Sequence, residues 1–329
     1  MKKIVIRKTG GPEVLEITEV PDPPVGEDRV LVDIRATGLN WSEVMIRRGD
    51  WPVEISRGFS LGAEGAGVVE QVGKSVTGIR PGDRVAVFDI RAYLEEEQGN
   101  YAEKIAVDAN KVLEIPEHMD FPEAAALPMA LLTAYDALIN HSPLPDSGTV
   151  VVTACTGAVG IAALQLARRR GLRAIGTTRS ENKKSLITSL GVEAVVDSDP
   201  LKLKEKIAGL CGDAGVDYIF DPINGETATQ LISLLNFGGT YVGYGFLGGD
   251  SFAVPSSFLF SQVKIHGYVV LRNLADPGAL QKVWREVLPL AETKEVVIPV
   301  HKKFPFVQVS EAHREFENGK HWGKLVLVQ

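Results

Sequence analysis

The 329-residue sequence has little cysteine and no long apolar run. Its two cysteines, Cys155 and Cys211, are too few for a disulfide framework and lack the paired spacing of a zinc ribbon. No apolar run approaches the ~20 residues of a membrane span, and the first residues contain no run long enough for a signal peptide. We therefore expect a cytoplasmic protein that has no membrane partner.

An excess of basic residues is also absent. The formal net charge is −7 with both signs interspersed, which leaves no basic surface for nucleic acid. Apolar residues make up 45% of the chain, and its length suffices for two domains with cores of their own. We therefore expect small molecules, rather than nucleic acid, as ligands.

Short β-branched runs dominate the first third of the chain. Glycine, proline and aspartate punctuate these runs, which is typical of a barrel or sandwich. The predicted strands lie within residues 2–8, 28–38, 65–73 and 82–88. A last run at residues 324–329 reads as a strand again, and we expect it to return to the first domain.

Strands and helices alternate after Phe121. This alternation predicts an α/β fold with a doubly wound parallel sheet. The strand candidates are Thr149–Cys155, Arg173–Thr178, Ala194–Asp197, Val216–Asp221, Gly239–Gly245 and Lys264–Val270.

A glycine-containing turn follows the first of these strands. Gly157 and Gly160 lie where the strand passes into an apolar helix, a position at which backbone N–H groups and the helix dipole bind a pyrophosphate. The match to the dinucleotide fingerprint is partial, because its first glycine falls on Cys155. Glycines at such a turn can be mere punctuation, but the five further strand candidates favour a dinucleotide site.

The end of the second strand indicates which dinucleotide binds. NAD-preferring sites place an acid there, about 20 residues after the turn. This chain has Thr178 at that place, followed by Arg179 and Lys183, and such cations suit the 2′-phosphate of NADP. Two readings remain beside this one: Glu181 favours NAD, and Ser180 favours an ordinary capped helix start.

Motifs through nearly the whole chain resemble the medium-chain dehydrogenase/reductase superfamily, and within it the zinc-free quinone oxidoreductase and enoyl reductase branch. The matching stretches are GPEVLEITEVPDPPVGEDRVLVDIRATGLN, LGAEGAGVVEQVGKSVTGIRPGDRV, GNYAEKIAV, AAALPMALLTAYDAL, the A-x-x-G-x-x-G turn at 154–160, and GKLVLV near the end.

The resemblance implies a Rossmann-type sheet inserted in a GroES-like, β-rich catalytic domain. We place the catalytic domain at residues 1–122 and 273–329, and the dinucleotide-binding domain at 123–272. A homodimer through the sheet edge near Lys264–Val270 is also implied. The implied cofactor is NADPH, with a binding set of Thr133, Ala154, Thr156, Gly157, Ala158, Val159, Gly160, Thr178, Arg179, Lys183, Gly245 and Lys324.

The departures from the zinc-dependent members predict that no metal binds. Those members carry a cysteine near GLNWSEV and a histidine in a GHE motif, where this chain has Asn40 and Ala63; only Glu64 remains. Their structural-zinc lobe has four closely spaced cysteines, and the corresponding region, 89–101, has none.

Hydride delivery to an already conjugated electrophile needs no Lewis acid. The resemblance assigns Asn40 to the catalytic site, where its amide can bond a substrate carbonyl or a cofactor hydroxyl; a turn residue is the alternative. Trp51 stands where the branch often has a tyrosine; it can stack on a planar ring but cannot deliver a proton, and packing is its alternative role.

Three functions remain open. The preferred one is an NADPH-dependent reductase of quinones or α,β-unsaturated carbonyl compounds. The second is an enoyl-thioester reductase. The third is a non-catalytic NADPH-binding redox sensor.

Overall fold

The computed structural model describes residues 1–51, 58–89, 98–270, 276 and 278–329. The chain divides into two compact units. The first comprises Met1–Leu132, Asn273–Glu292 and Ile298–Gln329, and the second comprises Thr133–Arg272 and Thr293–Val297. The domain boundaries that we place after residues 122 and 272 stay a prediction.

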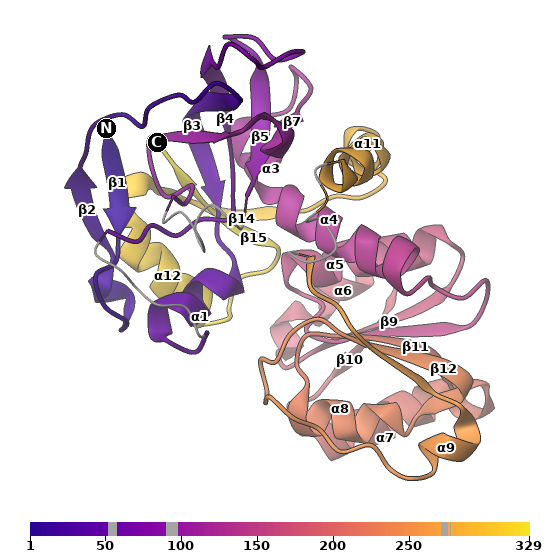
Figure 1. The fold of residues 1–329 in the computed structure, drawn as a ribbon. Coiled ribbons are helices and arrows are strands. Elements are labelled where there is room, and N and C mark those ends of the chain that lie inside the picture. The colour runs from indigo at the N-terminus through magenta and orange to yellow at the C-terminus, as the bar shows by residue number, and fades with distance from the viewer. Residues whose placement is uncertain (52–57, 90–97, 271–275, 277) are drawn as a thin grey trace. The chain divides into compact units, whose positions relative to one another are not determined.

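A mostly antiparallel sheet of seven strands forms the first unit. Its order is β14-β15-β3-β4-β5-β7, with β6 paired to β3, and β1 and β2 make a separate pair. Figure 1 shows β3, β4 and β5 side by side. The strands are β1 (Lys2–Val5), β2 (Glu16–Glu19), β3 (Arg29–Gly38), β4 (Glu64–Val72), β5 (Arg84–Phe88), β6 (Lys104–Asp108), β7 (Val112–Glu114), β14 (Val300–Pro305) and β15 (Lys324–Val328).

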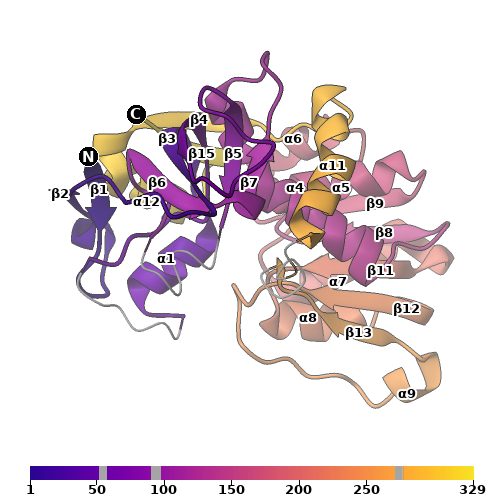
Figure 2. The same ribbon diagram turned by 45° about the horizontal axis from the view of Figure 1, so that its top comes forward.

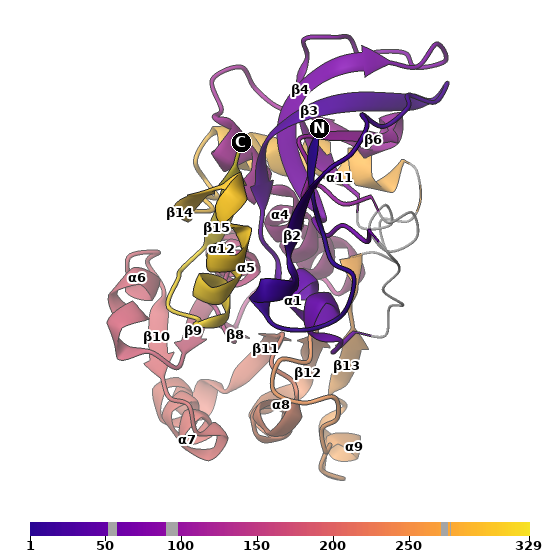
Figure 3. The same cartoon turned by 90° about the vertical axis from the view of Figure 1, so that its left-hand side faces the viewer.

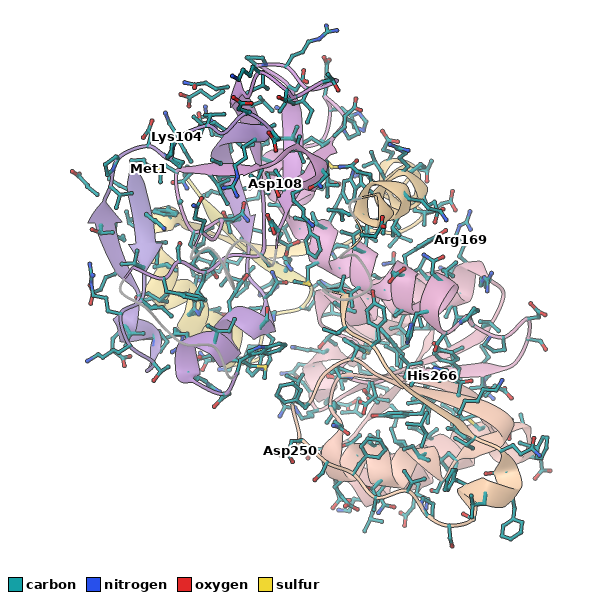
Figure 4. The ribbon with its side chains drawn as sticks, viewed as in Figure 1. Met1, Lys104, Asp108, Arg169, Asp250 and His266 are labelled. Atoms are coloured by element: carbon teal, nitrogen blue, oxygen red, sulfur yellow. The ribbon has the colours of Figure 1, made fainter. Side chains whose placement is uncertain are left out.

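Alternating side chains of these strands form the core of the first unit. Val30, Val32 and Ile34 of β3 point to one face and pack with valines of β4 and β5. The period of two in β3 therefore directs these three side chains into this cluster, while Leu31 is buried on the opposite face. Lys104 bonds Asp22, which also pairs with the amino group of Met1. Met1 and Lys104 are labelled in Figure 4.

Among the described residues, four helices accompany this sheet: α1 (Trp41–Arg48), α3 (Phe121–Ala126), α11 (Ala279–Glu292) and α12 (Val309–Glu317). Helix α12 lies along β15 (Figure 3). Helix α11 is tied to β7, because the indole of Trp284 donates to the carbonyl of Glu114 at 2.9 Å. The chain passes into the second unit within α4 (Pro128–Tyr135).

A six-stranded parallel sheet forms the second unit, in the order β10-β9-β8-β11-β12-β13. Figure 2 shows β12 and β13 at one edge of it. The strands are β8 (Thr149–Val152), β9 (Arg173–Thr178), β10 (Glu193–Val196), β11 (Val216–Asp221), β12 (Leu235–Gly243) and β13 (Lys264–Gly267). The intervening helices are α5 (Ala158–Arg169), α6 (Lys184–Thr188), α7 (Pro200–Cys211), α8 (Gly225–Ile232) and α9 (Phe258–Ser261).

The predicted fold class is confirmed. All six predicted strands of the parallel sheet exist, two of them with the predicted bounds. The first strand is shorter than predicted, because its last three residues, Thr153 to Cys155, form the turn. Strands β2, β6, β7 and β14 were not predicted, because their short runs mix polar and apolar residues. No helix within the described ranges is long and apolar enough to cross a membrane.

Candidate functional site

The predicted glycine turn lies between β8 and α5 in the second unit. Ala154 has φ 45°, a left-handed conformation that is uncommon for a residue with a side chain. A Cβ atom at Gly160 would lie 2.6 Å from Cα of Cys155, so this position requires glycine for close helix packing. At Gly157 a Cβ would meet only the Ala154 carbonyl, at 3.7 Å, so the start of the helix is open.

The N-terminus of α5 can hold an anion. Gly157 is the N-cap residue, and as a glycine it has no side chain with which to cap the 12-residue helix. Uncapped N–H groups and the helix dipole together bind phosphate. Of the residues predicted here, Thr156 and Ala158 are buried and Val159 is partly exposed.

Two cations follow the end of β9. Thr178 is buried and its hydroxyl accepts the backbone N–H of Ser180 at 3.3 Å. Arg179 is exposed, whereas Lys183 is only 8% exposed. Burial lowers the pKa of Lys183, and the charge of Arg179 lowers it further.

Asp221, which sequence analysis missed, ties three strand ends together. This fully buried carboxylate at the end of β11 accepts from the hydroxyls of Thr153 and Tyr241 and from the backbone N–H of Ile223 and Asn224. The sequence contains a signal for this residue, because the predicted strand Val216–Asp221 ends on an acid.

Two other predicted cofactor residues lie elsewhere in this unit. Gly245 follows β12, and a Cβ there would lie 2.8 Å from the Pro222 carbonyl. Thr133 is buried on α4.

Asn40, Glu64 and Lys324 form a buried polar cluster in the first unit. The Lys324 ammonium pairs with Glu64 and donates to Oδ1 of Asn40 at 2.6 Å. Nδ2 of Asn40 donates to Glu64 at 3.0 Å, and the backbone N–H of Met129 donates to the other Glu64 oxygen at 2.7 Å. Lys324, predicted to bind cofactor, is thus held by internal partners and is 2% exposed.

A second carboxylate, Glu43, supports Asn40 from α1. Its Oε2 accepts the backbone N–H of Asn40 at 2.8 Å, and its Oε1 accepts that of Ala63 at 3.0 Å and lies 3.4 Å from Asn40 Nδ2. The Tyr101 hydroxyl lies 3.0 Å from Glu43 and 2.9 Å from Nε2 of His313. Glu43, Tyr101 and His313 are all fully buried.

Arg47, one turn after Glu43 on α1, extends the buried polar groups towards α12. Its guanidinium pairs with Glu317 and donates to the carbonyl of Gly10. Because Arg47 is fully buried, removal of Glu317 would leave its guanidinium without its ion-pair partner. Trp51, the other predicted catalytic residue, is partly exposed.

Comparison with known proteins gives one consistent family. Residues 26–117 match the alcohol dehydrogenase GroES-like domain, and residues 158–293 match the zinc-binding dehydrogenase family. The chain is 29% identical to the quinone oxidoreductase of Rattus norvegicus, over 100% of this chain and 98% of that protein. The structure of Escherichia coli quinone oxidoreductase complexed with NADPH superposes with a TM-score of 0.89, at 26% identity over 100% of both chains.

The chain belongs to the quinone oxidoreductase branch of the medium-chain dehydrogenase/reductase superfamily. It is also 31% identical to a highly reducing polyketide synthase of Gibberella zeae, over 92% of this chain. The chain spans only 13% of that synthase.

Within this branch, the first unit is the GroES-like part and the second is the Rossmann-type part. Asn40 and Ala63 stand where the resemblance places a cysteine and a histidine in zinc-dependent members. Both lie at the polar cluster, because Asn40 is part of it and the backbone N–H of Ala63 donates to Glu43. In the part of the chain that the structure describes, no group of three or more His, Cys, Asp or Glu side chains is placed to hold a metal ion.

Gly38 controls how closely the cluster packs. A Cβ there would lie 2.5 Å from the Ala125 carbonyl and 2.6 Å from Glu64 Oε1. We expect Gly38→Ala to lower the free energy of unfolding of the first unit by about 1–3 kcal/mol, the usual cost of overpacking. Tryptophan fluorescence during denaturation measures it, because all four tryptophans belong to the first unit.

Gly26→Ala is the control for this variant. The nearest atoms to its added Cβ belong to Arg29 at 3.6 Å, an ordinary contact, and the residue is exposed. Equal unfolding midpoints for the two variants would mean that Gly38 does not set this packing.

Proposed function

We propose that the protein is an NADPH-dependent oxidoreductase that transfers a hydride to quinones or α,β-unsaturated carbonyl compounds without zinc. The observation that carries the proposal is the cation pair of Arg179 and Lys183 after β9, at the sheet edge where α5 begins without a side-chain cap. The similarity to a quinone oxidoreductase that was solved with NADPH supports it.

The second unit would hold the cofactor by its phosphates. The backbone N–H groups at the start of α5 would bind the pyrophosphate, and Arg179 and Lys183 would bind the 2′-phosphate. When bound, the cofactor supplies the hydride from its nicotinamide ring. Thr133 and Gly245 complete the proposed set.

Asn40 and Trp51 of the first unit would serve the acceptor. Reduction places negative charge on the acceptor's oxygen, and a positioned amide can stabilise that charge. The amide of Asn40 is oriented by Lys324 at its oxygen and by Glu64 at one N–H group. Its second N–H group meets Glu43 only at 3.4 Å, and this is the donor that would bond the acceptor. Trp51 would contribute a flat apolar surface for stacking.

A second candidate function is enoyl-thioester reduction. The similarity to a segment of a highly reducing polyketide synthase favours it. The same hydride chemistry serves both acceptor classes, so assay rather than fold must separate them.

We also propose a cytoplasmic homodimer that forms through β13. This strand is the last in the sheet order, so its outer backbone groups can pair with a second copy. Exposed apolar side chains near it include Ile265, Val269 and Phe260, the last 85% exposed. The side chain of His266 on the same strand is labelled in Figure 4.

We expect NADPH to bind more tightly than NADH by about 1.5–3 kcal/mol, the range for charge-assisted contacts. This difference corresponds to roughly 10- to 150-fold in Kd. The Arg179→Ala/Lys183→Met double variant should lose most of this preference, and methionine retains the buried stem of Lys183. Calorimetric titration of both cofactors measures the two dissociation constants.

The exposed neighbour Lys184 provides the control, since Lys184→Ala also removes one positive charge from this segment. Its preference should match that of the parent protein. Equal affinities for NADPH and NADH in the parent protein would refute the cofactor proposal.

An acceptor panel tests the reaction. We expect chelator-treated protein to oxidise NADPH with 1,2-naphthoquinone, 9,10-phenanthrenequinone, 2-cyclohexenone or 2-hexenal, at rates that added zinc does not raise. Turnover with crotonyl-CoA alone would favour the enoyl-thioester function. Cofactor binding without turnover on any acceptor would favour a redox sensor, and loss of activity on chelation would refute zinc independence.

Ile265→Lys tests the dimer. The chain mass is 35.6 kDa, so we expect light scattering to give about twice this mass for the parent protein and the single-chain mass for the variant. Ile17→Lys, at a similarly exposed isoleucine on β2 of the first unit, should leave the mass unchanged. A monomeric parent protein would refute the proposal.

A further inference from the structure

Tyr101 stands between a carboxylate and an imidazole, and its single hydroxyl proton can serve only one of them. Glu43 already accepts from the backbone N–H groups of Ala63 and Asn40. If Tyr101 also donates to Glu43, it must accept from His313, and Nε2 of His313 then carries the hydrogen.

The surroundings of Nδ1, on the other side of the His313 ring, decide whether the Tyr101 hydroxyl donates to Glu43 or to His313. Nδ1 is buried and has no hydrogen-bond partner among the residues that the structure describes. With the hydrogen on Nε2, Nδ1 is a bare acceptor; with the hydrogen on Nδ1, a buried N–H group would lack an acceptor. Orphaned buried N–H groups are the rarer of these two defects. The ring therefore favours donation from His313 to Tyr101.

A neutral Glu43 would require the opposite direction. Its carboxyl hydrogen would need an acceptor, and the backbone donors of Ala63 and Asn40 cannot reverse. The Asn40 amide cannot turn over either, because its Oδ1 is held by Lys324. Only the Tyr101 hydroxyl can turn, so that it accepts from Glu43 and donates to Nε2 of His313. The hydrogen of the neutral His313 ring would then be on Nδ1, which has no acceptor among the described residues.

We propose that Tyr101 and His313 are positioning residues for Asn40. The direction of the hydrogen bonds from His313 through Tyr101 keeps Glu43 ionised, and the ionised carboxylate holds the backbone and amide of Asn40 in one orientation. The consequence for turnover rests on the proposed function, in which Asn40 serves the acceptor.

Because Glu43 is buried, its ionisation is sensitive to the loss of the hydrogen bond from Tyr101. Burial raises the pKa of Glu43 to about 7, while the backbone N–H groups of Ala63 and Asn40 oppose the rise. Burial lowers the pKa of His313 to about 3, so the ring stays neutral. The other ionisable groups that face the cluster are Glu64, which raises the pKa of Glu43, Lys324, which lowers it, Tyr101 itself and Arg47.

Tyr101→Phe removes the hydroxyl and keeps the ring. We expect kcat for acceptor reduction to fall about tenfold, with Kd for NADPH within about twofold of the parent value. Because the carboxylate loses a donor to its charged form, the rise of kcat with pH should move up by about 0.5–1 pH unit. His313→Phe, which leaves Tyr101 in place, should move the profile in the same direction.

Tyr218→Phe is the matched control. Tyr218 is also fully buried and donates one hydrogen bond, to the Ser142 carbonyl at 2.6 Å, but it lies in the second unit. We expect its pH profile to match that of the parent protein. An equal loss of kcat in both tyrosine variants, with the pH profile unmoved, would overturn the positioning role.

The side-chain amide resonances of Asn40 in nitrogen-15-labelled protein provide a readout that needs no turnover. They should shift and exchange faster with solvent in Tyr101→Phe and in His313→Phe, but not in Tyr218→Phe. If the parent protein reduces no acceptor, the proposed function fails and these resonances alone decide the positioning. Unmoved Asn40 resonances in both cluster variants would overturn it.

Discussion

A lysine ammonium buried against a carboxylate is the interaction on which the first unit depends. Lys324 and Glu64 are almost completely buried, and removing each charge from water costs several kcal/mol. The cost is offset only while every partner stays in place, including the Asn40 amide and the Met129 N–H group. The cluster therefore fixes β15, β4 and the start of α1 against one another, and it requires glycine at position 38.

The second unit uses buried charge in a different way. Asp221 receives four donors and joins the ends of β8, β11 and β12, so this carboxylate is satisfied internally. The cations after β9 instead repel each other, and burial already disfavours the charge of Lys183. One edge of a single sheet thus holds a carboxylate that shapes the backbone and two neighbouring cations that lower each other's tendency to stay charged.

Periodicity sufficed to predict the parallel sheet and the turn at Gly157 and Gly160, because both depend on local chain properties. The polar cluster could not be predicted in this way. Glu43, Tyr101 and His313 lie far apart in the sequence, and only the bond of Glu43 to the Asn40 backbone, a capping box, has a local signal. The resemblance identified Asn40 and Lys324, but their mutual hydrogen bond depends on how β15 returns beside β3. Contacts of this kind follow from topology rather than from local pattern.

The position of Lys324 bears on the proposed absence of zinc. Its ammonium bonds the side chains of Asn40 and Glu64, and the resemblance relates Asn40 to a zinc-ligand position of the zinc-dependent members. A fixed cation at this point already compensates Glu64, and it would repel a divalent metal ion. Replacing Asn40 by cysteine would therefore place a thiolate beside the Lys324 ammonium, where the existing ion pair with Glu64 and the new thiolate would compete for the same cation.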